Sequence, residues 1–440
     1  MNTLKVPRRV STALLNSLSA GVTPRIGLEY MAVGRKREIE TLLEDLANIR
    51  EGGSVFRVIV GRYGSGKSFL LQIIRNYAMD RDYVVIDADL SPERKLTGNR
   101  GSGLATYREL LQNMATKVRP DGGALNAILE RWIAAVQMQL MKDEGFALND
   151  PLLAERMELS IMQAIHSMDD RVHGYDFARV LSAFWQGHRT GSDEMKSAAL
   201  KWLRGEYQTK TEANTELDVR VIIDDDTWFD YIKLFSDFVK QLGYAGLIML
   251  LDEGVNLYKI SNTQSRNNNY EKLLNMFNDT MQGKVQGLGV YLCGTPQFVE
   301  DNRRGLFSYE ALRTRLAGSR FAKELRDMQG PLIYLDKLTY EELFVLLHKI
   351  LEIHIIHYGW ESGVSEEDLL FFLQQAVNRI GADEWLTPRE IVRDFISVLN
   401  LVRQNPEQTF KRLVTGDLFK TTPPAESNDM EETDAAEFSL

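Results

Sequence analysis

The stretch IVGRYGSGKSFLLQ, residues 59–72, combines the end of an apolar strand, three glycines and the start of a helix. Residues 61–68 fit the phosphate-binding pattern G-x-x-x-x-G-K-[ST], in the strand–turn–helix context that this pattern requires. Glycines let backbone N–H groups surround phosphate oxygens, and the following helix directs its positive end at the same anion. A glycine-rich turn without a ligand is the alternative, and the context disfavours it. The sequence therefore predicts a site for a nucleoside triphosphate.

Two side chains of this loop carry specific chemistry. Lys67 is expected to reach the β- and γ-phosphates of ATP, and the Ser68 hydroxyl to coordinate Mg²⁺. Arg62 places an additional positive charge in the loop, which either tightens phosphate binding or pairs with an acid elsewhere. The predicted nucleotide-binding residues of the loop are Gly61, Arg62, Tyr63, Gly64, Ser65, Gly66, Lys67, Ser68 and Phe69.

A second signal follows the apolar run LIMLL, residues 247–251, which ends in Asp252 and Glu253. In proteins with this phosphate loop, the acid that ends the next core strand belongs to the Mg²⁺ shell. The carboxylate after it is placed to orient and deprotonate a water molecule. A solvated acidic strand end is the alternative. Together with the loop, the pair favours ATP hydrolysis, with Ser68 and Asp252 as metal ligands and Glu253 as catalytic base.

The apolar stretch VYLCGTPQF, residues 290–298, predicts a neighbouring strand. Thr295 follows its end and is a candidate catalytic residue that contacts the γ-phosphate or the attacking water. An ordinary Gly-Thr-Pro turn explains the same residues equally well. Cys293 lies within the strand and is expected to be buried and inert.

Composition is that of a soluble globular protein: 440 residues, 44% apolar and 26% charged. One cysteine excludes a disulfide framework and fits a reducing, cytoplasmic location. No apolar run approaches the roughly 18 residues that span a bilayer, so we expect no membrane contact. The net charge of −10 is dominated by the last twenty residues, whose six acids and absent Lys or Arg predict a disordered acidic tail.

Hydrophobic periodicity divides the chain. Strands are predicted at 54–61, 82–91, 218–223, 246–254, 287–294 and 330–335, with continuous apolar runs typical of a parallel sheet covered on both faces. Helical periodicity alone is found from about 103 to 217 and again after 336. The sequence thus predicts an α/β core interrupted by a helical insertion and followed by a helical segment.

Four motifs together resemble those of AAA+ ATPases of the origin-recognition-like branch: Val33-Gly34-Arg35, the phosphate loop, LLDEG and CGTP. More closely, the chain resembles the ATP-binding proteins of bacterial BREX phage-defence systems, the BrxC/BrxD family, and its length suits the shorter BrxD type. The stretches GLEYMAVGRKREIE (27–40), DADLSPERKLTG (87–98), GYAGLIMLLDEG (243–254) and LTPREIVRDFISVLN (386–400) carry this resemblance.

The resemblance implies an α/β fold with a P-loop AAA+ core, a large helical insertion and a C-terminal helical lid. The expected boundaries are an N-terminal arm at 1–30, the core at 31–103 and 218–335, the insertion at 104–217, the lid at 336–420 and the tail at 421–440.

The resemblance also implies roles for individual residues. Val33 and Gly34 would line the adenine pocket, and Arg389 would present its guanidinium to the γ-phosphate. An arginine finger acting across a subunit boundary is expected at Arg315, with Arg313, Arg303 and Arg304 as alternatives. Arginines in salt-bridged helix faces are the competing explanation. Arg62 departs from related loops, which often carry a neutral or acidic residue there.

By this resemblance the chain is an ATP hydrolase that drives assembly or remodelling of an anti-phage complex. Expected partners are other defence proteins and further subunits, as a homo- or hetero-oligomer. DNA is left open as a partner and is expected to bind weakly to the isolated chain, because the sequence shows no basic stripe. A nucleotide-gated binding switch with little hydrolysis is the rival function. A signalling ATPase of the STAND type ranks last, because no sensor repeats follow the core.

Three further signals have simpler explanations. Asp224, Asp225 and Asp226 precede a predicted helix and suit an N-cap rather than a metal. His348, His354 and His357 lie on one predicted helix. His354 and His357 share a face of it, but no third ligand has a spacing that suits a metal site. The polar run at 261–269 predicts a mobile loop, in which Arg266 and neighbouring asparagines are candidate DNA contacts.

Overall fold

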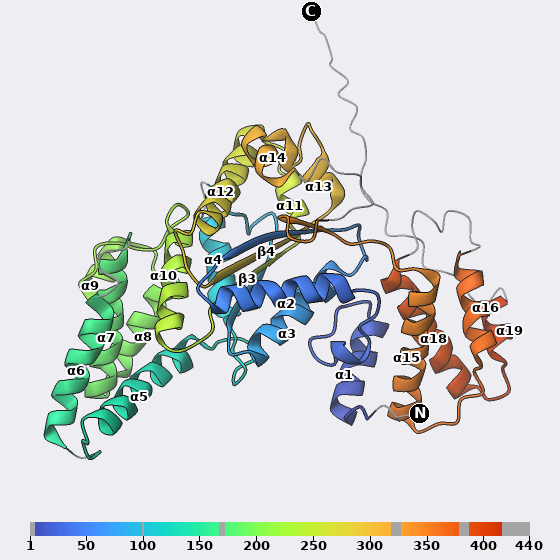
Figure 1. Cartoon of the computed structure of the whole chain (residues 1–440), viewed down its shortest axis with the longest axis horizontal. Helices are drawn as coiled ribbons and strands as arrows, with labels where there is room; N and C mark the ends of the chain where they lie inside the picture. Colours follow the sequence, from blue (N-terminus) through green and yellow to red (C-terminus); the bar gives the residue numbers. More distant parts are fainter. Residues whose placement is uncertain are drawn as a thin grey trace, which may run out of the picture. The chain divides into compact units, whose positions relative to one another are not determined.

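The computed structural model describes residues 5–98, 101–148, 150–166, 172–317, 327–377 and 387–415 (Figure 1). The chain forms two compact units. The larger unit runs from Arg35 to Asp336, and the smaller unit combines the residues up to Gly34 with those from Lys337 onward. The acidic segment 421–440, predicted to be disordered, lies outside the described residues.

A five-stranded parallel sheet forms the centre of the larger unit and confirms the predicted α/β fold. The strand order is β2-β3-β4-β1-β5. All of its pairings are parallel, so the carboxyl ends of the strands meet at one edge. The strands are β1 (Val55–Val60), β2 (Val84–Asp89), β3 (Leu247–Asp252), β4 (Leu288–Gly294) and β5 (Leu332–Tyr334).

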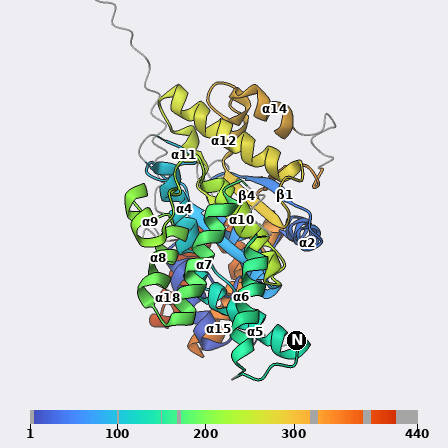
Figure 2. The same ribbon diagram turned by 90° about the vertical axis from the view of Figure 1, so that its left-hand side faces the viewer.

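Both faces of the sheet are covered, which explains the continuous apolar runs. In β1, Val55 and Ile59 join the hydrophobic cluster under α2 (Lys36–Arg50) and α3 (Lys67–Asp80). Phe56, Val58 and Val60 join the cluster on the other face. That face carries α10 (Trp228–Gln241) and α12 (Thr263–Met281), and α14 (Glu310–Leu316) lies beside α12 (Figures 1 and 2).

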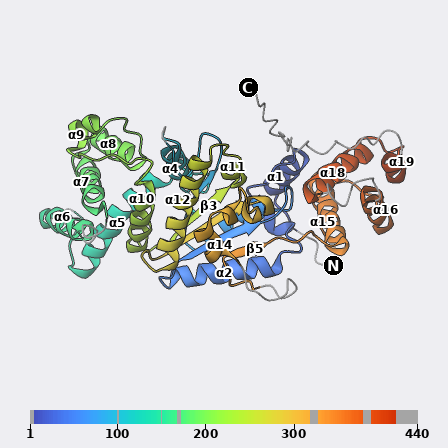
Figure 3. The same cartoon turned by 90° about the horizontal axis from the view of Figure 1, so that it is seen from above.

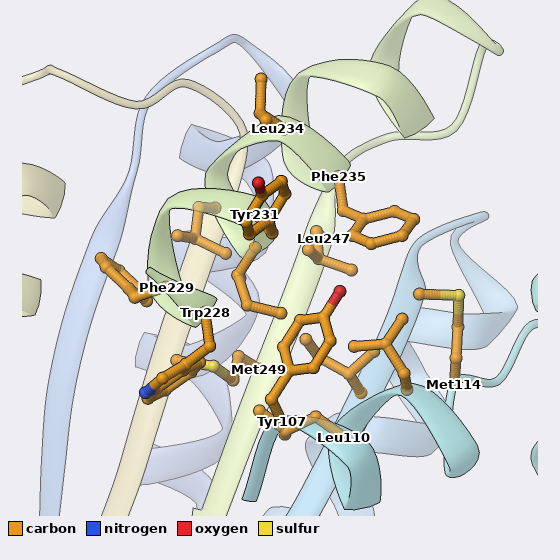
Figure 4. Packing of buried hydrophobic residues seen from close by; sticks show 14 of the residues in the cluster. Tyr107, Leu110, Met114, Trp228, Phe229, Tyr231, Leu234, Phe235, Leu247 and Met249 are labelled. Carbon is orange, nitrogen blue, oxygen red and sulfur yellow. The ribbon is translucent and has the colours of Figure 1, made fainter. Parts of the chain in front are cut away.

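Most of the described residues between 102 and 241 form helices, as predicted. Helices that follow one another along the chain lie side by side there (Figure 3). Their core is continuous with the sheet: Figure 4 shows Tyr107, Trp228 and Tyr231 packed around Leu247 and Met249 of β3. The insertion therefore adds to the core of the sheet. Besides α10, the helices are α4 (Ser102–Gln112), α5 (Leu125–Asp143), α6 (Pro151–His166), α7 (Gly174–Thr190), α8 (Asp193–Leu203) and α9 (Lys210–Leu217).

Two predictions about local structure are wrong. Residues 218–223 form no strand, although Val219 and Ile223 are buried. Val219 and Ile223 belong to the large hydrophobic core cluster, so their apolar pattern reflects burial rather than strand pairing. The predicted loop at 261–269 is mostly helical, because α12 begins at Thr263 with the Asn262 side chain as its cap.

The smaller unit is helical. α1 (Arg8–Ser19) packs on α15 and α18. Capping boxes start two of its helices, with Thr339 paired to Glu342 and Thr387 paired to Glu390. No helix among the described residues is both long and apolar enough to cross a membrane. The other helices of this unit are α15 (Tyr340–Tyr358), α16 (Glu366–Val377), α18 (Pro388–Gln404) and α19 (Phe410–Thr415).

Candidate functional site

The glycine-rich loop between β1 and α3 turns in a way that requires its glycines. Gly64 and Gly66 have φ angles of +69° and +96°, a region that side chains with a Cβ rarely adopt. A Cβ on Gly61 would lie 2.4 Å from the Ser65 hydroxyl oxygen. The loop is therefore tightly wound at the amino end of α3, where free N–H groups and the helix dipole favour an anion.

Lys67 is the first residue of α3, and its ammonium lies within the loop. Nζ donates to the carbonyl oxygens of Gly61 and Arg62, at 2.9 Å each. The ring of Tyr63 lies 5.4 Å from this nitrogen. The first turn of α3 contains no acid. The loop thus combines a lysine with the positive end of a helix, as binding of a polyphosphate requires.

Ser68 and Asp252 come together at the carboxyl edge of the sheet. The Ser68 hydroxyl donates to Oδ2 of Asp252 at 2.6 Å. Asp252 is the last residue of β3, and β4 separates that strand from β1. The two predicted metal ligands, 184 positions apart, are therefore neighbours. Both offer hard oxygen atoms of the kind that Mg²⁺ prefers.

Glu253 lies in a strained turn directly after β3. Its φ angle is +56°, in the left-handed region that costs a residue with a Cβ roughly 1–3 kcal/mol. Its N–H donates to Oδ1 of Asp252 at 2.7 Å. Gly254 approaches β4 so closely that a Cβ there would lie 2.5 Å from the Cys293 carbonyl oxygen. This turn interrupts the alternation of the strand and leaves the Glu253 side chain exposed.

Asp89 is an acid of the same edge that the sequence analysis missed. It ends β2 and lies in register with Asp252 on β3. Partial burial raises the pKa of the Asp89 carboxyl, and the charges of Asp252, Asp87 and Glu253 raise it further. The acids are thus concentrated at this edge of the sheet. The signal was present in the sequence DAD, but only the strand order places it beside Asp252.

Arg35 forms hydrogen bonds to the backbone of the phosphate loop. Its side chain is 5% exposed and donates to the carbonyl oxygens of Ser65 at 3.0 Å and Asp336 at 2.7 Å. Glu38 lies 3.6 Å from the same guanidinium. Arg35 therefore fixes the position of the loop relative to the segment that follows β5, a role that its sequence position alone does not reveal.

Thr295 follows β4, the strand directly beside β1. Its hydroxyl oxygen accepts the N–H of Phe298 at 3.2 Å and caps the short helix α13 (Pro296–Glu300). The Gly61 N–H donates to the Gly294 carbonyl oxygen at 3.0 Å. The turn explanation therefore accounts for Thr295, and its contact with phosphate stays a prediction. Cys293 is buried as expected, and burial raises the pKa of its thiol.

The candidate finger arginines form other contacts. Arg315 on α14 donates through Nε to the Asn278 side chain of α12 at 2.8 Å. Arg313 lies 3.8 Å from Glu310. The Arg304 guanidinium lies over the Tyr258 ring at 5.3 Å. Their action across a subunit boundary stays a prediction.

The remaining nucleotide-binding candidates belong to the smaller unit. Gly34 has a φ angle of +71°, and a Cβ there would lie 2.6 Å from the Glu342 carboxyl carbon. Arg389 lies in the first turn of α18, after Pro388. The proposed adenine contacts of Val33 and Gly34, and the phosphate contact of Arg389, stay predictions.

The structure also shows the contacts of the residues for which the sequence offered simpler explanations than a functional site. The Asp225 carboxylate accepts hydrogen bonds from the N–H groups of Gly101 and Leu104, at 3.0 and 2.7 Å. It therefore caps the start of α4 rather than that of α10, the helix that follows it in the sequence. Arg266 is buried and donates to the Ile260 carbonyl oxygen at 2.7 Å, so the suggested DNA contact at this residue is wrong. Within the described ranges no group of three or more His, Cys, Asp or Glu side chains could hold a metal ion.

Fold and site together define a P-loop protein with a parallel α/β core, built to bind a nucleotide at the carboxyl edge of its sheet. The family model of the BREX system ATP-binding protein BrxC/D matches residues 6–417. The chain therefore belongs to this family, which implies an ATP-binding role in phage defence and other defence proteins as partners. No curated protein matches the chain.

Proposed function

We propose that the chain hydrolyses ATP with Mg²⁺ and uses this cycle to assemble or remodel a BREX-type defence complex in the cytoplasm. The observation that carries the proposal is the 2.6 Å hydrogen bond between Ser68 and Asp252, which joins the phosphate loop to the acidic end of β3. Binding alone requires the loop and its lysine. The nearby Glu253 supplies what hydrolysis additionally requires, a carboxylate for a water molecule.

The oxygen donors fit Mg²⁺. Mg²⁺ usually binds one or two protein oxygens and completes its shell with water and substrate phosphates. The Ser68 hydroxyl and the Asp252 carboxylate are such a pair. When bound, the ion would neutralise charge that develops on the phosphate oxygens.

Each of the candidate side chains has a separate role in the proposed reaction. Lys67 offers positive charge to the β- and γ-phosphates. The Glu253 carboxylate accepts a proton from water while the water oxygen bonds to the γ-phosphorus. The bond from that phosphorus to the β–γ bridging oxygen breaks, which gives ADP and inorganic phosphate. Thr295 would orient the water or contact the γ-phosphate, since it follows the strand beside β1.

Contributions from the other candidates belong to the same proposal. Val33 and Gly34 would contact adenine, Arg389 would contact the γ-phosphate, and Arg315 would act on the site of a neighbouring subunit in a homo- or hetero-oligomer. The BrxD-like subtype is likewise proposed.

The test is steady-state ATP turnover per subunit over a wide range of protein concentration. Glu253→Gln removes the base while preserving shape, so we expect turnover to fall roughly 100-fold or more with ATP binding retained. Glu93→Gln, an exposed acid in the loop after β2, is the matched control and should turn over like the wild type.

Wild-type turnover that equals the Glu253→Gln value at every concentration would contradict hydrolysis. The loop would then act as an ATP-gated switch for a partner. In that case ATP binding, measured with a fluorescent analogue, would still depend on Lys67.

A further inference from the structure

Arg62 is an exposed residue of the phosphate loop, directly after the first glycine of that loop. Its backbone is fixed there, because its carbonyl oxygen accepts the N–H of Ser65 at 3.2 Å and the ammonium of Lys67 at 2.9 Å. Its guanidinium forms no hydrogen bond or ion pair with any residue that the structure describes. Of the two roles that the sequence left open for this charge, pairing with an acid is therefore not observed among these residues.

The contacts of Lys67 place Arg62 at one end of the triphosphate site. The lysine of a phosphate loop reaches the β- and γ-phosphates, and Nζ of Lys67 lies 2.9 Å from the carbonyl oxygens of both Gly61 and Arg62. A carbonyl oxygen is roughly 2.4 Å from its own Cα, so the Arg62 Cα lies within about 5–6 Å of this nitrogen. An extended arginine side chain is longer than that distance. The guanidinium can therefore reach the phosphates that Lys67 is expected to bind.

The charges around the loop make a second cation useful for one nucleotide in particular. Asp252 lies 2.6 Å from the Ser68 hydroxyl, and Glu253 follows Asp252 directly. These carboxylates repel a phosphate group that approaches the same edge of the sheet. ATP has one phosphate more than ADP and hence about one more negative charge. Lys67 supplies a single positive charge, so the additional charge of Arg62 favours ATP.

We propose that Arg62 determines the preference of the site for ATP over ADP, by binding the γ-phosphate through its guanidinium. The inference rests on the nucleotide-binding part of the proposed function and not on hydrolysis. A guanidinium presents paired N–H donors to two oxygen atoms of one phosphate, whereas the ammonium of Lys67 is a point charge shared between phosphates. Lys67 therefore serves both nucleotides, and Arg62 serves the one that carries the third phosphate.

The test compares the dissociation constants of ADP and of an ATP analogue with an imido group between the β- and γ-phosphorus atoms. Both are measured with Mg²⁺ by displacement of a fluorescent nucleotide. Arg62→Ala should weaken binding of the analogue roughly 10- to 100-fold, as expected for lost charge-assisted hydrogen bonds, and should change ADP binding less than about threefold. Arg62→Lys keeps the charge without the paired donors, so its affinity for the analogue should be intermediate.

Two further variants serve as controls. Lys67→Ala should weaken the binding of both nucleotides, because its ammonium is expected to contact a phosphate that both carry. Arg220→Ala should bind both like the wild type, since Arg220 is another exposed arginine of the larger unit without a hydrogen bond or ion pair to the described residues. Arg62→Ala should unfold at the wild-type temperature, because an exposed side chain without partners contributes little to stability.

An unchanged ratio of the two dissociation constants in Arg62→Ala would overturn the proposal, whether both affinities fall together or neither falls. A loss of affinity that appears only at protein concentrations where subunits associate would also overturn it, because Arg62 would then act on the nucleotide of a neighbouring subunit. A wild type without ATP turnover would contradict the proposed hydrolysis and leave these binding constants unaffected. The two failures are therefore distinguishable.

Discussion

Glu253 has a backbone conformation that its residue type disfavours. Its φ angle of +56° lies in the left-handed region, which glycine adopts readily and which strains a glutamate. The neighbouring contacts maintain this state: its N–H bonds to Asp252, and Gly254 is close against β4. Backbone strain that packing holds in place is commonly found at functional sites. We infer that the proposed function, rather than stability, requires a carboxylate at this position.

Glu253→Gly should therefore stabilise the protein while abolishing ATP turnover. Relief of the left-handed strain should raise the free energy of unfolding by about 0.5–1 kcal/mol, measured by urea denaturation. Asp82→Gly is the control, because Asp82 also has a positive φ angle, +63°. It precedes β2 and therefore lies away from the carboxyl edge of the sheet. It should stabilise by a similar or smaller amount and leave turnover intact. A destabilised Glu253→Gly protein would argue against strain at this turn.

At the scale of elements, local cues and packing both position the helices. The Thr387 side chain caps α18, and Pro388 is the first residue of that helix. The contact of α18 with α15 is decided by packing. There His354 is buried, accepts a hydrogen bond from the Trp360 indole at 3.0 Å and lies 3.2 Å from the Asn400 side-chain oxygen.

This contact predicts a pH dependence of stability. Burial lowers the pKa of His354 to about 4. Between that value and about 6.5 the unfolded chain binds a proton that the folded chain does not, so stability should fall as pH decreases through this window. The loss contributed by His354 is at most about 3 kcal/mol, with little change from this group above pH 7.

His354→Gln should remove this part of the pH dependence of urea unfolding. His348→Gln, at a partly exposed position of the same helix, should retain it. Equal pH profiles for wild type and His354→Gln would show that the buried imidazole does not titrate as inferred.

The whole molecule consists of two compact units, and the predicted nucleotide-binding residues are divided between them in the sequence. The phosphate loop, its supporting Arg35 and the acids of β2 and β3 all lie in the larger unit. Val33, Gly34 and Arg389 lie in the smaller unit. The expected finger, Arg315, forms hydrogen bonds to Asn278 and Ala311 within the larger unit, and its proposed action is on the site of a second subunit.

Subunit mixing tests that requirement. Arg315→Ala and Glu253→Gln should each be nearly inactive alone. A mixture should recover part of the turnover, because Arg315 of the second variant can complete the site of the first. A mixture of Arg313→Ala with Glu253→Gln should show no such gain over the turnover of its Arg313→Ala component. No recovery at any mixing ratio would exclude Arg315 as a finger in trans.

The sequence by itself determined the parts of this protein that depend on near neighbours. The phosphate loop, the Asp-Glu-Gly turn and most helix and strand positions follow from turn chemistry and periodicity, which span a few residues. Only the tertiary structure decided which distant residues meet. It placed Asp89 beside Asp252, left residues 218–223 without a strand partner, buried Arg266 and joined the start of α1 to the end of α15. These outcomes depend on strand order and side-chain packing, which involve residues far apart in the chain.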